Sequence, residues 1–401
     1  MHLLAKLHPH QVDSVKFSLD RKYCILGLEM GLGKTLCAIA TAIEAKASCV
    51  LIVVPAFLKS NWEQEIAKFT EGFEATIVSY SQLKKVEGKF DFIIADECHY
   101  LKNHQTKRAK FFESLLDNSD PEYLLMLSGT PIKNRVGEFW NLLRLCHKGG
   151  KLSSFDDFSR KNNYFKFQYF FSNAVTQWFG NREVVKFEGM RNIDKLSPMV
   201  NSCRLRMKSK DVMDLPDMVN IDFKIKDKSK YDKDFKELFT LDLRKNNETY
   251  MLVKKNNAIA KCGCTIKLAS EIIDSGEKVV IFTDHVQPSV EIARALGVEA
   301  INGKMPPEQR ARRVQEFESD RTAVALVATI GSLSVGVNLT SASYMVFNDL
   351  PFVPADLDQA KKRIHRIGQT KKCFYYYVYI SDLDRRLQSL IYSKRKIIEA
   401  L

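Results

Sequence analysis

The sequence predicts an α/β protein with two mostly parallel sheets, each with helices on both faces, and a small helical insertion between them. Three observations lead to this prediction. Short apolar runs alternate with helix-length stretches in residues 1–148. The alternation stops over residues 149–218 and returns over residues 219–401. A chain of 401 residues is also long enough for two or three domains.

The first sheet is predicted from five apolar runs. Each run is only a few residues long, as a strand buried on both faces should be. Helix-length stretches such as residues 35–46 separate the runs, and this alternation is typical of an open parallel sheet. The runs are residues 24–27, 50–54, 75–78, 92–95 and 123–127.

The rest of the chain divides at a change in composition. Aromatic and basic residues mix in residues 165–171, so we interpret residues 149–218 as a mostly helical insertion and linker. Buried strands are expected again at residues 279–282, 323–327 and 344–347. Residues 383–401 have a helical pattern with an apolar stripe.

Charge and cysteine content restrict the class of protein. The net charge is +13 and the isoelectric point is about 9.1. Such a surplus favours a polyanionic partner, although it also serves solubility alone. The sequence has no apolar run of the roughly 18 residues that span a bilayer, and its first residues do not resemble a signal peptide. Nine scattered cysteines indicate reduced thiols, and we expect a cytoplasmic protein, bacterial or viral.

A phosphate-binding loop is predicted at residues 30–35. The segment Met-Gly-Leu-Gly-Lys-Thr follows a predicted strand and begins a predicted helix. Gly31 and Gly33 allow a tight turn whose N–H groups can face phosphate oxygens. Lys34 would hold the β- and γ-phosphates, and Thr35 would bind Mg²⁺ through its hydroxyl. The alternative is an ordinary glycine-rich turn, which the strand-loop-helix context disfavours.

An acidic pair follows the predicted strand at residues 92–95. Asp96 can hold Mg²⁺ at the strand end, and Glu97 can polarise the attacking water. An acidic loop after a strand is common in α/β proteins. Its position about 60 residues after Lys34 favours the catalytic interpretation.

Seven segments in this order resemble the conserved motifs of the Swi/Snf-type ATPases of helicase superfamily two. The match extends over nearly the whole chain, and its order is more specific than any single motif. In the first half the matching segments are Leu7, Pro9 and Gln11, residues 29–35, residues 51–55 with Asn61 and Trp62, residues 96–99 with residues 101–103, and residues 127–132 with Asn134. In the second half they are residues 336–340, and Gln359, Arg363 and His365 with residues 366–369.

The resemblance implies two RecA-like P-loop lobes that bind ATP and Mg²⁺. Residues 1–148 would form the ATP-binding lobe and residues 219–401 the C-terminal lobe. Gln11 would contact adenine, and Arg363 and Arg366 would reach the γ-phosphate as arginine fingers, although a solvated basic helix face is the simpler explanation for these two arginines alone. The expected nucleotide-binding residues are Gln11, Glu29, Met30, Gly31, Leu32, Gly33, Lys34, Thr35 and Gly336.

The resemblance also implies that nucleic acid lies across both lobes. Contacts of this kind go mostly to phosphates, so they position the duplex without reading its bases. Each of the implied residues is otherwise an ordinary loop residue. They are Pro55, Lys59, Ser79, Tyr80 and Thr130 in the first lobe, and Thr283, Thr329 and Gly331 in the second.

The sequence departs from the family pattern at several positions, which affects the subfamily more than the ATPase. Leu28 stands where the family usually has Asp, and Lys361 and Lys362 replace an acidic pair. Because the matching segments take up nearly the whole chain, we expect a version without large chromatin-binding appendages. We therefore expect a minimal ATP-dependent translocase on duplex or branched DNA. A strand-separating helicase, or a nucleotide-dependent DNA-binding switch with little turnover, remains the alternative.

Two further signals are given less weight. Cys262 and Cys264 are not accompanied by a second ligand pair at the spacing that zinc sites use. His8 and His10, close to the N-terminus, are expected at the surface.

Overall fold

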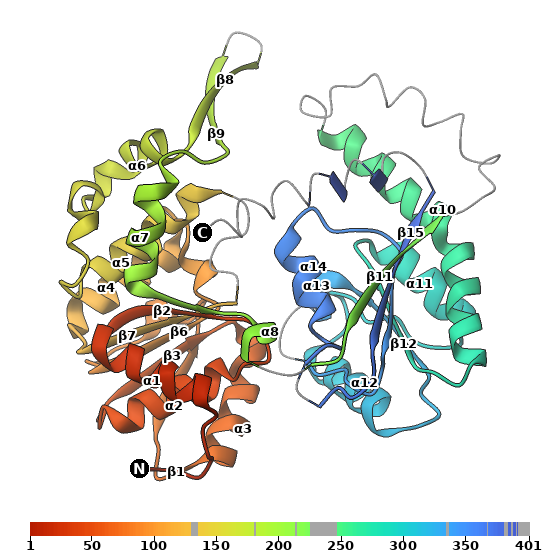
Figure 1. The fold of residues 1–401 in the computed structure, drawn as a ribbon, viewed down its shortest axis with the longest axis horizontal. Helices are drawn as coiled ribbons and strands as arrows, with labels where there is room; N and C mark the ends of the chain where they lie inside the picture. The colour runs from red at the N-terminus through yellow and green to blue at the C-terminus, as the bar shows by residue number, and fades with distance from the viewer. Residues whose placement is uncertain are drawn as a thin grey trace. The chain divides into compact units, whose positions relative to one another are not determined.

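The chain forms two compact units, each with its own sheet, in a computed structural model (Figure 1). Unit 1 comprises Met1–Met213 with Lys394–Leu401, and unit 2 comprises Asp214–Ser393. The structure describes residues 1–129, 135–179, 182–212, 215–224, 247–333, 337–366, 368–380, 384–385, 388–389 and 391.

Unit 1 is built on a six-stranded parallel sheet with the order β10-β2-β7-β6-β3-β5. All five strands predicted for this region are confirmed. The side chains of the four inner strands are almost entirely buried, which explains why these strands appear in the sequence as apolar runs. The strands are β2 (Tyr23–Leu28), β3 (Val50–Val54), β5 (Ala75–Ser79), β6 (Phe92–Asp96), β7 (Tyr123–Leu127) and, at the edge, β10 (Arg204–Met207).

Helices cover both faces of the unit 1 sheet. On one face, alternate strand residues such as Ile25, Val53 and Met126 share a core with α4 (Lys107–Ser119), α5 (Phe139–His147) and α7 (Ile193–Cys203). The other face carries α1 (Pro9–Arg21), α2 (Lys34–Glu44) and α3 (Lys59–Phe69) (Figure 1). Shorter elements are β1 (His2–Leu3) paired with β4 (Thr70–Glu71), and 3-10 helices η1 (Ala56–Leu58), η2 (Leu83–Lys85), η3 (Cys98–Leu101), η4 (Val136–Glu138), η5 (Ser153–Phe158) and η6 (Lys161–Asn163).

The segment predicted as a mostly helical insertion also contains strands. Its helices are α6 (Tyr164–Phe171), α7 and α8 (Ser209–Val212). Between α6 and α7 the chain forms an antiparallel hairpin of β8 (Asn173–Phe179) and β9 (Arg182–Glu188), and β10 then joins the unit 1 sheet beside β2. These strands were not expected because they mix polar and apolar residues, as exposed hairpins and edge strands do.

Unit 2 has a five-stranded parallel sheet with the order β11-β15-β14-β12-β13. The predicted strands are confirmed as β12 (Val279–Thr283), β13 (Ala325–Thr329) and β14 (Tyr344–Phe347). The sequence did not reveal the other two. β11 (Met218–Lys224) is an edge strand with alternating exposure, and β15 (Cys373–Tyr379) is built from tyrosines rather than aliphatic residues.

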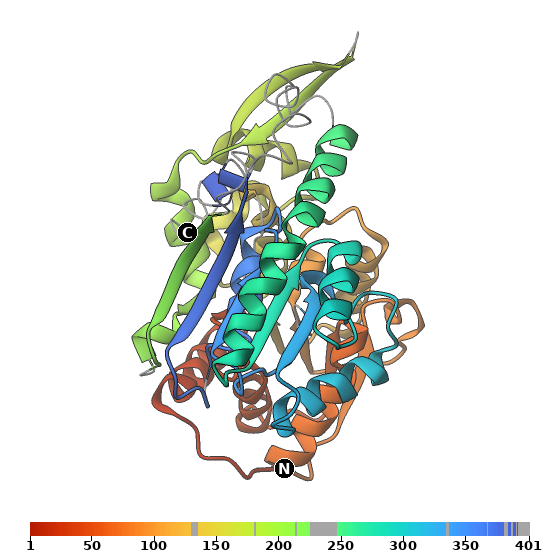
Figure 2. The same ribbon diagram turned by 90° about the vertical axis from the view of Figure 1, so that its right-hand side faces the viewer.

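Both faces of the unit 2 sheet are covered, as predicted. One core joins Phe282, Met345 and Tyr375 to α12 (Pro307–Ser319), α13 (Ile330–Leu333) and α14 (Pro354–Lys361). The other joins Ile281 and Val327 to α10 (Asn247–Asp274) and α11 (Val286–Ala295), which lie along the sheet in Figure 2. Both units therefore have the RecA-like architecture that was predicted. Most of the helix expected at residues 383–401 lies outside the described residues.

No helix in the described part of the chain has the length and apolar character needed to cross a membrane.

Candidate nucleotide site and nucleic-acid surface

The predicted phosphate loop connects the carboxyl end of β2 to the first turn of α2. Gly31 and Gly33 have φ angles of 85° and 75°, a region that side chains other than glycine rarely adopt. A Cβ atom at Gly33 would also crowd the side-chain amide of Gln11, although the end of that flexible side chain can shift. Glycine is therefore required at Gly33 by its backbone conformation. The loop ends at a helix N-terminus, which favours an anion.

Lys34 and Thr35 are the first two residues of α2. The ammonium group of Lys34 donates a hydrogen bond of 2.9 Å to the carbonyl oxygen of Leu28, so the side chain folds back over the loop. Behind this turn the helix is anchored, because its residues 36–42 are buried without interruption. The side chains of Lys34 and Thr35 therefore extend from a well-packed helix at the end of the phosphate loop.

The upstream motif packs directly on the phosphate loop. Gln11 accepts a hydrogen bond from the N–H of His8 and directs its amide group to the carbonyl oxygen of Leu32, at 3.4 Å. A ring nitrogen of His10 lies 3.2 Å from the same carbonyl oxygen. His10 is only 6% exposed, so the expectation of a surface position was wrong for this residue. It was wrong because the contact joins residues 22 apart in the sequence.

Asp96 ends β6, two strands away from the phosphate loop. Its carboxylate accepts hydrogen bonds from the indole N–H of Trp62, at 2.8 Å, and from the backbone N–H of Glu97, at 2.8 Å. Burial, together with the neighbouring charge of Glu97, raises the pKa of Asp96 to about 6, although the Trp62 bond and the charge of Lys34 oppose this. A buried carboxylate with too little positive charge around it is suited to a cation.

Glu97 adopts a left-handed backbone conformation, with φ at 51°. Its carboxylate oxygen Oε2 lies 3.0 Å from Nδ1 of His99 and accepts a hydrogen bond of 3.4 Å from the hydroxyl of Ser128. Ser128 follows β7, the strand between β2 and β6. The carboxylate of Glu97 is therefore oriented from the neighbouring strand. This contact joins residues 31 apart and was not evident from the sequence.

Glu29 has a partner outside the nucleotide loop. Its carboxylate accepts a hydrogen bond of 2.6 Å from the N–H of Ser209 and a second bond from the Ser209 hydroxyl. Its own N–H donates to the carbonyl oxygen of Met207. Residues 204–212 thus brace the loop from the side. Leu32 is fully buried and Met30 half-buried, so both support the loop from within.

Unit 2 brings two predicted motifs together. The guanidinium groups of Arg363 and Arg366 both donate to the carbonyl oxygen of Val337, at 3.2 and 3.3 Å. Gln369 ties the same turn to the carbonyl oxygens of Thr340 and Ala342. Arg363 is almost fully buried, whereas Arg366 is half-buried. Gly336, expected beside the nucleotide, lies outside the described residues.

The residues expected to contact nucleic acid lie at the carboxyl ends of strands or just beyond them, but differ in accessibility. Tyr80 is 5% exposed, and its hydroxyl donates to the carbonyl oxygen of Asp96. The hydroxyls of Thr283 and Thr329 also have partners within their own loops. Buried side chains are Pro55, Ser79, Tyr80, Thr283 and Thr329; Lys59 is half-buried, Gly331 is exposed, and Thr130 lies outside the described residues. Their role in binding stays a prediction.

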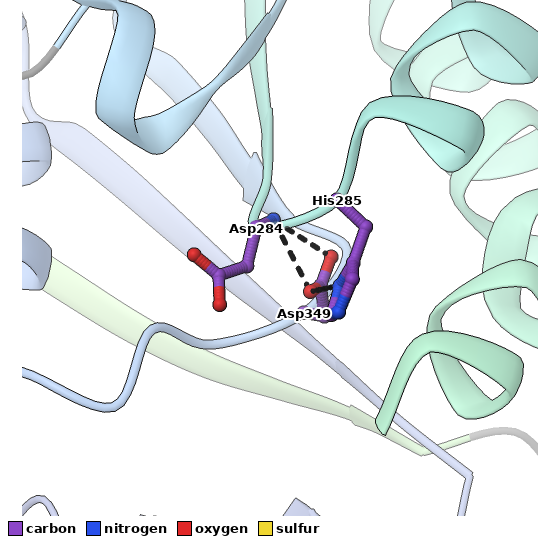
Figure 3. Close-up of side chains that lie close together, drawn as sticks. All are labelled: Asp284, His285 and Asp349. Carbon is purple, nitrogen blue, oxygen red and sulfur yellow. Dashed lines mark hydrogen bonds and ion pairs between the residues drawn. The ribbon is translucent and has the colours of Figure 1, made fainter. Parts of the chain in front are cut away.

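An acidic cluster in unit 2 is explained by its hydrogen bonds (Figure 3). Asp349 accepts bonds from the N–H of Asp284 and from Nδ1 of His285. Burial by itself raises the pKa of Asp349, but the bond from His285 and the charges of Lys261 and Lys254 lower it below its ordinary value. The carboxylate of Asp284 points away from the other two side chains and pairs with Lys254. We therefore assign the cluster to the support of the loop after β12.

Two families of domains match the chain. The SNF2-related domain matches residues 10–87 and 72–268, and the helicase conserved C-terminal domain matches residues 263–368. Among curated relatives, the DNA annealing helicase and endonuclease ZRANB3 of Mus musculus is 25% identical over 98% of this chain and 40% of its own length. A SWI/SNF-related matrix-associated actin-dependent regulator of chromatin subfamily A-like protein 1 homolog of Caenorhabditis elegans is 28% identical over 94% and 59%.

The chain thus spans between 40% and 59% of the length of these relatives. A solved structure of the Sulfolobus solfataricus SWI2/SNF2 ATPase core in complex with dsDNA has 23% identity and a TM-score of 0.45, covering 99% of this chain and 92% of that one. The SNF2-related match takes in well over half of the 401 residues, including the phosphate loop and the Asp96–Glu97 pair. The chain belongs to the SNF2-related family, with a helicase C-terminal domain.

Proposed function

We propose that this protein is a DNA-stimulated ATPase that couples ATP hydrolysis to movement along duplex or branched DNA. The observation that carries the proposal is the grouping at one edge of the unit 1 sheet. The phosphate loop follows β2, Ser128 follows β7, and Asp96 and Glu97 end β6. In parallel sheets the carboxyl ends of adjacent strands meet, and ligands bind there.

The phosphate loop fits a nucleoside triphosphate with its metal ion. Lys34 would neutralise the β- and γ-phosphates, and the hydroxyl of Thr35 with the carboxylate of Asp96 would hold Mg²⁺, which prefers oxygen ligands. The raised pKa of Asp96 supports this assignment, because a bound cation would remove the cause of the shift. When bound, Mg²⁺ would offset charge that develops on the phosphate oxygens.

Glu97 is proposed as the group that takes a proton from the attacking water. Its side chain is only 9% exposed and has a hydrogen bond from Ser128 that fixes one oxygen. General-base catalysis of this kind contributes about 10²–10⁴ in rate. Ser128 would act as a positioning residue, because its hydroxyl contacts the carboxylate of Glu97.

Arg363 and Arg366 are proposed to stabilise the γ-phosphate during transfer. Their anchoring to the Val337 carbonyl oxygen presents two cations from a single turn. A guanidinium of this kind contributes about 10³–10⁵ in rate. DNA bound to both units would favour the arrangement in which these arginines reach the nucleotide, and this coupling would make turnover depend on DNA.

DNA is proposed as the polymer for two reasons. The net charge of +13 favours a polyanion, and two of the relatives above are named as a DNA helicase and a chromatin regulator. Binding would depend mostly on phosphate contacts, so affinity should fall with salt at a log–log slope near −0.9 for each phosphate neutralised on duplex.

The proposal is tested by measuring ATP turnover at saturating ATP and Mg²⁺ without DNA and with single-stranded, duplex or forked DNA. We expect strong stimulation by duplex or forked DNA. A protein that binds ATP but is stimulated by none of these substrates would be the nucleotide-dependent switch instead. Displacement of a labelled strand from the fork, measured in parallel, separates a strand-separating helicase from a translocase.

A further inference from the structure

The hairpin β8–β9 projects from α6, away from the sheet of unit 1 (Figures 1 and 2). It leaves several large apolar side chains in contact with solvent. Trp178 is 64% exposed, and Phe165 and Tyr169 on α6 are 58% and 51% exposed. Side chains of this size are usually buried, so a group of them on one projection indicates a binding surface.

The pairing register places Trp178 and Phe187 on the same face of the hairpin. Residues directly opposite in an antiparallel pair point to the same side, and the side alternates along each strand. Trp178 pairs with Glu183, and Ala174 pairs with Phe187, four residues further along β9. The ring of Phe187 packs on Phe165 and Tyr169, with centroids 6.3 and 4.9 Å apart.

An aromatic stripe therefore runs from α6 along one face of the hairpin to Trp178. Its exposed members are Phe165, Tyr169, Val185 and Trp178, and the ring of Phe187, which is only 6% exposed, packs against the first two. Strand geometry separates Phe187 from the Trp178–Glu183 pair by about 13 Å, which is enough for several stacked nucleotides at 3.4 Å each. The opposite face carries Val175 and Lys186, which pair with each other.

Charge identifies the partner that fits this stripe. Residues 161–195 contain six Lys or Arg and three Asp or Glu, so the segment that carries the exposed rings has a surplus of positive charge, although Glu183 is the residue opposite Trp178. Lysines also contact rings next to the stripe, since Lys195 lies 5.4 Å from the ring centroid of Phe170 and Lys166 lies 5.5 Å from that of Phe158. Exposed aromatic rings among cationic side chains are the surface that binds single-stranded nucleic acid, whose bases stack and whose phosphates are anionic. Protein-binding surfaces, in contrast, are depleted in lysine.

We infer that the aromatic stripe of the β8–β9 hairpin binds single-stranded nucleic acid by stacking, with Trp178 as its outermost ring. This inference rests on the proposed function, since it assumes that the chain works on DNA. It assigns a single-strand site to unit 1 that is separate from the duplex contacts expected at the strand ends.

Tryptophan fluorescence gives a direct test. The chain has three tryptophans, and Trp62 and Trp140 are fully buried, so Trp178 is the one that solvent and ligands reach. Titration of the full chain with oligothymidylate, without nucleotide, should quench its emission. Trp178→Ala should remove this quenching and weaken oligothymidylate binding roughly 5- to 150-fold, measured by anisotropy of a labelled oligonucleotide. Trp178→Tyr should retain most of the affinity.

Val175→Ala is the matched control, because it truncates an exposed residue on the opposite face of the same hairpin. It should bind oligothymidylate like the wild type.

Trp178→Ala should also keep duplex-stimulated turnover within about 2-fold. Unchanged emission with oligothymidylate, while duplex DNA still stimulates turnover, would overturn the hairpin inference alone. Emission that changes with protein concentration instead would identify a contact between copies of the chain, which also overturns it. Absence of stimulation by both duplex and forked DNA would overturn the proposed function.

Discussion

The indole N–H of Trp62 donates a hydrogen bond of 2.8 Å to the carboxylate of Asp96, and both side chains are buried. Trp62 lies in α3, the helix that follows the β3 strand, so the contact joins two motifs 34 residues apart. It holds Asp96 at the strand end without supplying a positive charge. The carboxylate is therefore well positioned but incompletely compensated.

The first prediction concerns the effect of the Asp96 carboxylate on stability. Because the folded pKa of Asp96 is about 6 and the ordinary value is 3.8, the folded state binds the proton more tightly than the unfolded state. Its contribution to stability is present below pH 3.8 and is lost as the pH rises through about 6. We compare Asp96→Asn with the wild type in metal-free buffer. As the pH rises across this window, the free energy of unfolding of Asp96→Asn should increase relative to that of the wild type by up to about 3 kcal/mol. Urea denaturation of both proteins between pH 4 and 7 measures the difference, and a difference that is constant with pH would contradict the shift.

The second prediction concerns Glu97. Glu97→Gln keeps the size of the side chain but cannot take a proton, so ATP should bind and persist. Single-turnover hydrolysis should slow by about 10²–10⁴, while retention of labelled ATP on the protein stays close to wild type. Ser128→Ala removes the bond that orients Glu97 but keeps the base itself, so it should cause a smaller fall in turnover. Normal hydrolysis by Glu97→Gln would make Glu97 a structural acid.

The third prediction concerns Lys34. Lys34→Ala should abolish hydrolysis and weaken ATP binding, because the phosphates lose their cation. Folding should be retained, since the side chain is half-buried and its bond to the Leu28 carbonyl oxygen can be replaced by water. Lys16→Ala, an exposed position on α1, is the matched control and should behave as wild type. Circular dichroism and turnover measured on the same samples separate loss of chemistry from loss of structure.

The fourth prediction concerns Arg366. Arg366→Ala should lose most DNA-stimulated turnover, by about 10³ or more, and keep ATP affinity within a few fold. Arg312→Ala on α12 removes an arginine whose side chain is 75% exposed and should retain stimulation. The comparison is turnover with and without duplex DNA at saturating ATP. Full stimulation of Arg366→Ala would transfer the role to Arg363 or to another residue.

The fifth prediction concerns stability far from the nucleotide. Arg144 donates a hydrogen bond of 2.6 Å to Glu113, and both side chains are buried. Burial by itself raises the pKa of Glu113, but Arg144 and Lys161 lower it to about 2. Arg144→Ala leaves the Glu113 carboxylate with only Lys161 and Lys148 as nearby cations and should lower the free energy of unfolding by about 1–3 kcal/mol.

The double variant Arg144→Met with Glu113→Met removes both charges from the same site. It should regain most of the stability lost by Arg144→Ala, because apolar side chains of similar size commonly replace a buried ion pair at little cost. Thermal denaturation of the three proteins tests this. A double variant as unstable as Arg144→Ala would show that packing by the guanidinium stem, rather than its charge, sustains this part of unit 1.

Sequence reasoning located the strands whose side chains are buried on both faces, because such strands must be aliphatic. It did not locate β8, β9, β10, β11 or β15, because the first four mix polar with apolar residues and β15 consists largely of tyrosine. The phosphate loop and the Asp96–Glu97 pair were evident because local spacing defines them. Their supports were not, since Ser128, Trp62 and Ser209 reach their partners across 31, 34 and 180 residues.

The position of β10 has a consequence for how the protein is made. Strand β2, which leads into the phosphate loop, has only β7 as a neighbour until β10 pairs with its other edge. Glu29 and Ser209 are 180 residues apart, and this distance corresponds to roughly 10–40 s of translation. A nascent chain on the ribosome therefore carries an open strand edge beside its nucleotide loop for most of that time. ATP binding should be acquired only when the segment after α7 has emerged, so a bound nucleotide would show that β10 has paired with β2.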